Sequence, residues 1–177
     1  MQITRRTTLG LLAAAVPFAA YASTSEDTDK VVKVTLWDKG KNSMAGLGKE
    51  PGMGMGMHGA ATSAMGGGGM GATMGIDATP HEVKAGDVTF EVTNTSTDLI
   101  HEMVVIPLAS PTAAPPYNAA ENEIDEDAAG AIGEVSETEP GKTGSVTLRL
   151  KPGTYMLVCN VMGHYAMGMW TLLTVTA

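Results

Sequence analysis

The sequence has a single cysteine, Cys159, among 177 residues. An internal disulfide is therefore excluded, and an unpaired thiol in an exported chain must pair with another chain, stay reactive, or bind a metal ion. Basic residues are also scarce, since 11 Lys and Arg stand against 19 Asp and Glu. Contacts to nucleic-acid phosphates need clustered Lys and Arg, so we expect no nucleic-acid partner.

Long apolar runs are absent after the first 22 residues, which predicts no membrane span in the mature chain. Residues 1–22 themselves have the form of an export signal, with Arg5 and Arg6 ahead of an apolar stretch and a small-x-small site that ends at Ala22. The paired arginines favour the twin-arginine route, with Sec export as the alternative because Thr8, two positions after Arg6, is not a large apolar residue. We therefore expect a periplasmic or otherwise exported protein, with residues 23–177 as one monomeric domain that carries a net charge of −10.

Short stretches in which apolar and polar residues alternate recur along the chain. In the first of them, Val32, Val34 and Leu36 share one face, which is typical of a strand with one buried side. Strands expected from this alternation cover residues 31–37, 88–93 and 144–150. Mostly apolar or β-branched stretches bounded by turn signals add strands over residues 100–106 (closed by Pro107), 154–159 and 170–176. Because turn signals separate them and helical periodicity is almost lacking, the sequence predicts an all-β antiparallel sandwich.

Residues 38–75 have a different composition. Between Met44 and Gly75 there are twelve glycines and seven methionines, with no aromatic and no β-branched apolar residue. Glycine loses more conformational entropy on ordering than any other residue, so we expect a flexible Gly/Met-rich loop inserted after the first strand. The thioethers of this loop are soft donors suited to Cu(I). The candidate ligands for a secondary Cu(I) site within the loop are Met53, Met55, Met57 and His58.

Residues 107–140 interrupt the strand pattern a second time. This segment has eight carboxylates and no Lys or Arg between Glu121 and Glu139, and a short helix is expected within residues 119–131. An acidic surface can steer a basic partner such as a cytochrome or an oxidase. A solvated loop without a partner explains the same composition.

The stretch from Cys159 to Met169 concentrates the metal-binding side chains of the chain. It holds Cys159, His164 and Met169, with Gly163 and Gly168 placed to turn the backbone between them. A thiolate and imidazoles with a weak axial thioether form the ligand set of a blue-copper electron-transfer site. The stretch is therefore a candidate copper loop.

Three methionines of this stretch compete for the axial position. Met162 lies between the cysteine and the histidine, and Met167 follows the histidine by three residues. Met169 is in phase with Leu173 and Val175 on the expected inward face of the last strand. We favour Met169, with Met167 as the alternate.

A copper site of this kind needs a second histidine from elsewhere in the chain. His101 begins an apolar strand and shares one face with Met103 and Val105, so its side chain is expected to point inward. His58 in the Gly/Met-rich loop and His81 near a strand start are weaker candidates.

With these residues in place, the region from about residue 76 to 177 resembles the cupredoxins. The motifs that carry the resemblance are Ala85-Gly-Asp-Val-Thr-Phe90, the strand-borne His101, Lys151-Pro-Gly-Thr-Tyr155 and the Cys–His–Met loop. The spacing Cys-x4-His-x4-Met is that of the sulfocyanin and rusticyanin-like branch. One departure is Glu102, because cupredoxins often have Asn or Ser there to brace the cysteine loop.

The resemblance implies a Greek-key β-sandwich that binds one type 1 copper ion through His101, Cys159, His164 and Met169. It implies a carrier of single electrons between Cu(II) and Cu(I) that works with a redox protein. The methionine series suggests an alternative function, copper tolerance or delivery with additional Cu(I). An enzyme is not expected, since copper oxidases need further histidines, often as His-x-His pairs, and four histidines without such a pair are present.

Overall fold

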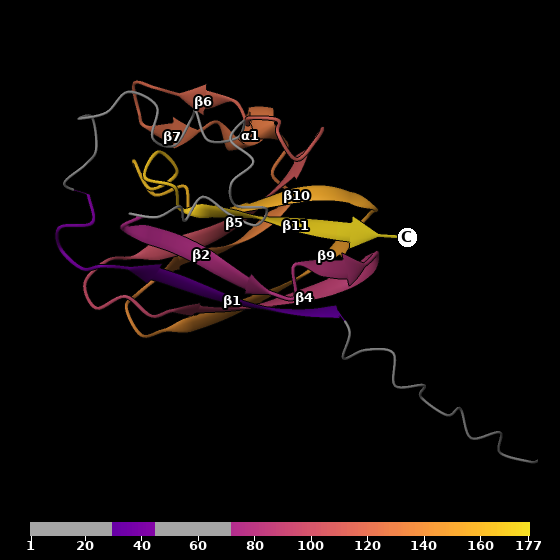
Figure 1. The fold of residues 1–177 in the computed structure, drawn as a ribbon, viewed down its shortest axis with the longest axis horizontal. Coiled ribbons are helices and arrows are strands. Elements are labelled where there is room, and N and C mark those ends of the chain that lie inside the picture. Colours follow the sequence, from indigo (N-terminus) through magenta and orange to yellow (C-terminus); the bar gives the residue numbers. More distant parts are fainter. Residues whose placement is uncertain (1–29, 45–71) are drawn as a thin grey trace, which may run out of the picture.

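The computed structural model describes residues 30–44 and 72–177, which form two β-sheets packed face to face (Figure 1). Sheet A has the strand order β2-β1-β4-β9, and sheet B has the order β3-β11-β10-β5-β8. The strands of sheet A are β1 (Val31–Asp38), β2 (Met74–Thr79), β4 (Gly86–Asn94) and β9 (Thr143–Leu150). Those of sheet B are β3 (Glu82–Lys84), β5 (His101–Leu108), β8 (Gly133–Thr138), β10 (Gly153–Val158) and β11 (Trp170–Thr176).

The main core lies between the two sheets. Sheet A contributes side chains such as Val34 and Phe90, and sheet B contributes Met103, Leu157 and Leu173, all of them almost completely buried. β4 alternates between buried and accessible positions because its other face is open to water. Such alternation made β1, β4 and β9 of sheet A recognisable in the sequence, whereas β2 was not predicted as a strand.

Sheet B is buried on its second face as well. The insert between β5 and β8, residues 109–132, forms the short hairpin β6 (Tyr117–Asn118) and β7 (Glu123–Ile124) and the single turn α1 (Glu126–Ala129). Figure 1 shows this insert on the side of sheet B away from sheet A. It covers a second apolar cluster that includes Val104, Met156 and Trp170. Burial on both faces explains why β5 and β10 have nearly continuous apolar sequences.

The predicted all-β sandwich is confirmed, but it is not purely antiparallel, because β1 pairs with β4 and β3 with β11 in parallel. Three assignments along the chain also differ. β5 continues through Pro107, which faces Tyr155 of β10, whereas the pairing of β5 with β8 ends at Val105. Pro107 has no N–H to donate, and this costs no hydrogen bond to β8, because β5 no longer pairs with β8 at that position.

The second correction concerns both ends of the Gly/Met-rich loop predicted over residues 38–75, because Asp38 is the last residue of β1, and Met74 and Gly75 belong to β2. Met74 is fully buried in the core. A Cβ at Gly75 would lie 2.6 Å from the ring of Trp37, its cross-strand partner in β1, so glycine leaves room for the indole. Residues 45–71, which include Met53, Met55, Met57 and His58, lie outside the described residues.

The third correction is β8, which was assigned to the acidic interruption. Its buried residues, Val135 and Thr138, are three positions apart, and they pair with Met103 and His101 of β5, which are two apart. This extra residue is a β-bulge, and it removes the strict alternation by which strands are recognised. The helix predicted within residues 119–131 is present as α1 alone. No helix among the residues in the described ranges is long and apolar enough to cross a membrane.

Candidate metal centre

His101 and Cys159 meet because their strands are neighbours in sheet B. His101 is the first residue of β5, and Cys159 directly follows β10. The two strands pair antiparallel up to Val104 and Val158, so the start of one lies beside the end of the other. Both side chains are completely buried.

The loop from Cys159 to Met169 brings His164 to the same point. Its ends are joined by a hydrogen bond of 3.0 Å from the N–H of Cys159 to the carbonyl of Met169, and the N–H of Met169 donates to the carbonyl of His164 at 3.0 Å. Gly163 and Gly168 have φ values of +82° and +91°, a region that glycine adopts at little cost. The two glycines therefore make the tight return of the chain possible.

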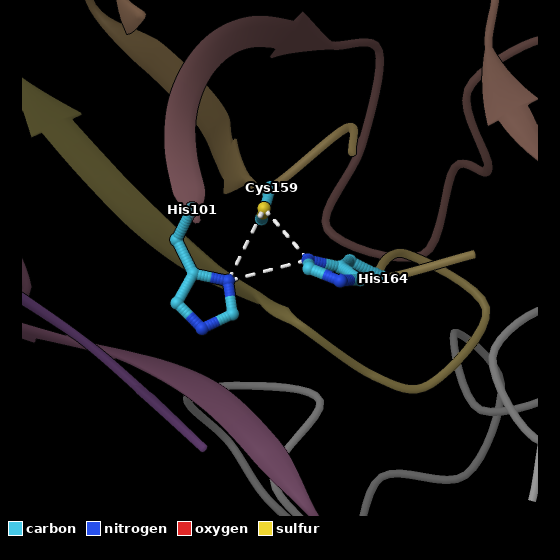
Figure 2. Close-up of side chains that lie close together, drawn as sticks. All are labelled: His101, Cys159 and His164. Carbon is cyan, nitrogen blue, oxygen red and sulfur yellow. Dashed lines mark hydrogen bonds between the residues drawn. The ribbon is translucent and has the colours of Figure 1, made fainter. Parts of the chain in front are cut away.

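Three donor atoms converge between these elements (Figure 2). Nδ1 of His164 lies 3.2 Å from both Nδ1 of His101 and Sγ of Cys159, and Sγ lies 3.8 Å from Nδ1 of His101. Such spacings allow one transition-metal ion to be shared, because bonds to imidazole nitrogen and thiolate sulfur are about 2.0 to 2.3 Å long in zinc sites. The three residues fit the in-plane ligand set of a type 1 copper centre.

Burial keeps these donors uncharged when no metal is bound. It raises the pKa of the Cys159 thiol to about 12, against the opposing effect of backbone N–H donors that include Glu102 at 3.4 Å. Burial, together with the neighbouring His101, lowers the pKa of His164 to about 4. Burial also lowers the pKa of His101, although Asp38 opposes this. The imidazoles can therefore offer lone pairs at neutral pH, while the thiol must lose its proton.

The three methionines of the loop differ in burial. Met169 is completely buried and belongs to the same apolar cluster as Cys159. Met167 is partly buried against that cluster, whereas Met162 is 59% exposed. Met169 is also followed by buried Leu173 and Val175, the inward face that the sequence predicted.

Glu102 replaces the expected Asn or Ser and still connects the two ligand-bearing segments. Its backbone N–H donates to Sγ of Cys159, and its carboxylate accepts a hydrogen bond from the backbone N–H of Asn160. Burial, followed by repulsion from Glu126 and other carboxylates, raises the pKa of Glu102 to about 7. A carboxyl group thus braces the cysteine loop in this chain.

Sequence reasoning missed Asp38 and Asn160. Oδ2 of Asp38 lies 2.9 Å from Nε2 of His101, and neither side chain is exposed. Asn160 connects the copper loop to the insert through the backbone of Ile124 and the carboxylate of Glu126. The available signals were an acid at the end of an alternating strand and an amide next to the cysteine.

Of the other histidines, His81 lies between β2 and β3, where its carbonyl accepts from the N–H of Thr174. It is not part of the cluster of His101, Cys159 and His164. His58 lies outside the described residues.

Residues 63–176 match the family model of copper binding proteins of the plastocyanin/azurin family. The chain belongs to this family. The resemblance to cupredoxins that the motifs indicated is thereby confirmed, and the copper-binding donor set agrees with it.

Individual cupredoxins are similar over parts of the chain. Auracyanin-B of Chloroflexus aurantiacus is 36% identical over 83 residues, which are 43% of this chain and 35% of that protein. The chain thus matches only about a third of the length of this relative. Rusticyanin from Thiobacillus ferrooxidans superimposes with a TM-score of 0.50 at 16% identity, over 82% of this chain and 76% of that one, and supports the fold. A reduced auracyanin of Roseiflexus castenholzii is 26% identical, with a TM-score of 0.42, over 56% of this chain and 87% of that one.

Proposed function

We propose that this protein is an exported carrier of single electrons. His101, Cys159 and His164 would hold its copper, with the thioether of Met169 as the fourth donor. The observation that supports this best is the convergence of two Nδ1 atoms and one Sγ within 4.8 Å of one another. When bound, copper supplies a centre that alternates between Cu(II) and Cu(I).

The protein's contribution is a dry and rigid set of donors. His101 and Cys159 are fully buried, and the loop that carries His164 is closed by backbone hydrogen bonds at both ends. Side chains that are fixed in this way cannot follow the different geometries that the two oxidation states prefer. The energy of reorganisation on electron transfer is therefore kept small.

His164 is the least buried of the three donors, at 4% exposure, and we assign the exchange of electrons to its side of the molecule. Met162 of the same loop and Ile100 beside His101 are exposed apolar side chains that fit a docking rim. The excess of acidic residues favours a basic redox protein as partner. An enzymatic role is not proposed, because the four histidines of the chain do not include the pairs that a catalytic second copper needs.

The decisive experiment is the addition of Cu(II) to the purified apoprotein. We expect an intense visible thiolate-to-copper band in the wild-type protein and its loss in Cys159→Ala. The matched control is Met162→Leu, a volume-conserving change at an exposed position of the same loop, which leaves the band intact. Absence of the band in the wild-type protein, or its survival without the thiol, would contradict the assignment.

Copper handling is a second candidate function, favoured by the methionine-rich composition of residues 44–75. It requires Cu(I) sites in addition to the type 1 centre. Counting bound Cu(I) against a competing chelator distinguishes the two functions.

A further inference from the structure

Asp38 connects the two sheets at the metal-binding end of the sandwich. It is the last residue of β1 in sheet A, and its carboxylate reaches His101, the first residue of β5 in sheet B. Oδ2 lies 2.9 Å from Nε2 of His101, and the exposure of both side chains is 0%. The buried carboxylate of Asp38 therefore contacts Nε2 of the His101 ring, whereas Nδ1, the candidate copper-binding atom, faces His164 on the other side of the ring.

Both oxygens of this carboxylate have a role as acceptor. Oδ1 accepts the backbone N–H of Gly40, and Oδ2 faces the ring nitrogen of His101. A carboxylate offers only acceptor atoms, and with Oδ1 on Gly40 and Oδ2 on Nε2 this geometry is the one that the Nε2–H tautomer of His101 satisfies. In the neutral ring the lone pair is then on Nδ1.

That lone pair is directed to the place where the copper ligands converge. Nδ1 of His101 faces Nδ1 of His164 at 3.2 Å and Sγ of Cys159 at 3.8 Å, while Nε2 points away from both (Figure 2). Ring nitrogens that bind metals commonly have their orientation and tautomer set by a hydrogen bond from the other nitrogen.

We propose that Asp38 is a positioning residue for the copper centre. It fixes His101 as the Nε2–H tautomer and holds the ring in its ligating orientation. As a buried negative charge next to a ligand, it also stabilises the more highly charged Cu(II) and so lowers the reduction potential. This inference rests on the proposed function, because it assigns His101 to the copper.

A purely structural role for the same carboxylate is a clear competing explanation. Through Gly40 it fixes the turn that follows β1, and that contact alone explains a buried aspartate. The two roles differ in their consequences for His101, so the readouts must report on this ring and on the metal rather than on folding alone.

Asp38→Asn is the informative variant. Asparagine has nearly the same shape, but its single oxygen cannot accept from both Gly40 and His101, and its NH₂ group would face one of the two donors. The matched control is Asp98→Asn, which removes one negative charge from a carboxylate that is ion-paired with Lys41 and has 35% side-chain exposure.

The first measurement is made on the apoprotein and needs no copper. Nitrogen-15 NMR of the histidine rings should find His101 as the Nε2–H tautomer in the wild-type protein and in Asp98→Asn. In Asp38→Asn we expect Nδ1–H to be populated. A wild-type His101 that carries its proton on Nδ1 would overturn the proposal directly, whatever the variants do.

The second measurement is made on the copper-loaded protein. Competition with a chelator should show copper bound about 10- to 100-fold more weakly by Asp38→Asn, as is typical when a partner of a ligand is lost. The reduction potential of that variant should rise, while Asp98→Asn stays near the wild-type value. Asp38→Glu keeps the charge and should recover the wild-type potential at least in part.

Three further results would overturn the proposal: an unchanged tautomer in Asp38→Asn, a potential equal to that of Asp98→Asn, or no recovery in Asp38→Glu. If Asp38→Asn does not fold, the wild-type NMR measurement and the Asp38→Glu potential still decide. Absence of the thiolate-to-copper band in the wild-type protein is a different failure. It would remove the proposed function and leave the tautomer result standing.

Discussion

The side-chain amide of Asn160 pairs with the backbone of Ile124 in both directions. Its Oδ1 accepts the N–H of Ile124 at 2.7 Å, and its Nδ2 donates to the carbonyl of Ile124 at 3.0 Å. The side-chain amide of Asn160 thereby makes the pair of hydrogen bonds with Ile124 of β7 that a neighbouring strand would make. Since Asn160 directly follows Cys159, this pair fixes the acidic insert to the start of the copper loop.

We expect Asn160→Ala to destabilise the apoprotein by about 2 to 3 kcal/mol, because the buried N–H and carbonyl of Ile124 lose their partners. Urea unfolding measures the change. Asn118→Ala is the control, since that exposed amide contacts only Glu121 and Ala120 of its own turn and should cost less than about 0.5 kcal/mol. Equal losses in both variants would show that the insert is not fastened through Asn160.

Copper uptake should release about one proton per metal ion near neutral pH. The pKa of Cys159 is raised to about 12 and that of His164 is lowered to about 4, so in the apoprotein between these values the thiol is protonated and that imidazole is neutral. Within this window a rise in pH removes a competing proton, and the affinity for copper should increase about tenfold per pH unit.

A pH indicator in weakly buffered solution measures this release on addition of stoichiometric copper. Cys159→Ala is the control and should release almost none. A release near zero in the wild-type protein would mean that the sulfur does not bind as a thiolate, and a release near two would mean that a second group, such as Glu102 with its pKa of about 7, also loses a proton on binding.

Met169 and Met167 can be distinguished by their effects on the reduction potential. In blue-copper sites the axial ligand tunes the potential. Met169→Leu removes an electron-pair donor from the site, and loss of a donor costs the more highly charged Cu(II) more than Cu(I), so we expect the visible band to persist and the potential to rise. Apoprotein stability should change by less than about 1.5 kcal/mol, since the swap conserves volume. Met167→Leu serves as the matched comparison, and a larger shift there would make Met167 the axial ligand.

Removal of residues 45–71 tests the copper-handling alternative without disturbing β2, where Met74 is buried in the core. We expect the visible band of the shortened protein to match the wild-type band. If the wild-type protein binds more than one Cu(I) and the shortened protein binds one, the methionine-rich segment is a copper store. An unchanged stoichiometry leaves electron transfer as the only supported function.

Most of the sandwich could be predicted from the alternation of apolar and polar residues, because one face of sheet A is exposed to solvent. Strands such as β1 and β9 alternate along their length, and the residues that alternate inward form the core. In sheet B the insert covers the second face, so β5 and β10 gave an apolar run rather than a pattern. Turn signals and strand length identified them instead.

The candidate ligands could be predicted because a type 1 site needs unusual residue types at short spacing. Cys159, His164 and Met169 lie within one loop with four residues between each and the next, and His101 followed from the inward face of its strand. The partners of these ligands could not be predicted. The contact of Asp38 with His101 spans 63 residues and depends on how the two sheets are packed, which local patterns do not encode.

The neighbourhood of β5 and β10 has a consequence for the order of assembly. His101 and Cys159 are 58 residues apart in sequence, and they meet only after these two strands have paired. Before β5 and β10 have paired, the three-donor site is incomplete, because the copper loop alone lacks the imidazole of His101. The complete centre can therefore form only after this distant contact has closed. The return of colour during refolding in the presence of copper would time that closure.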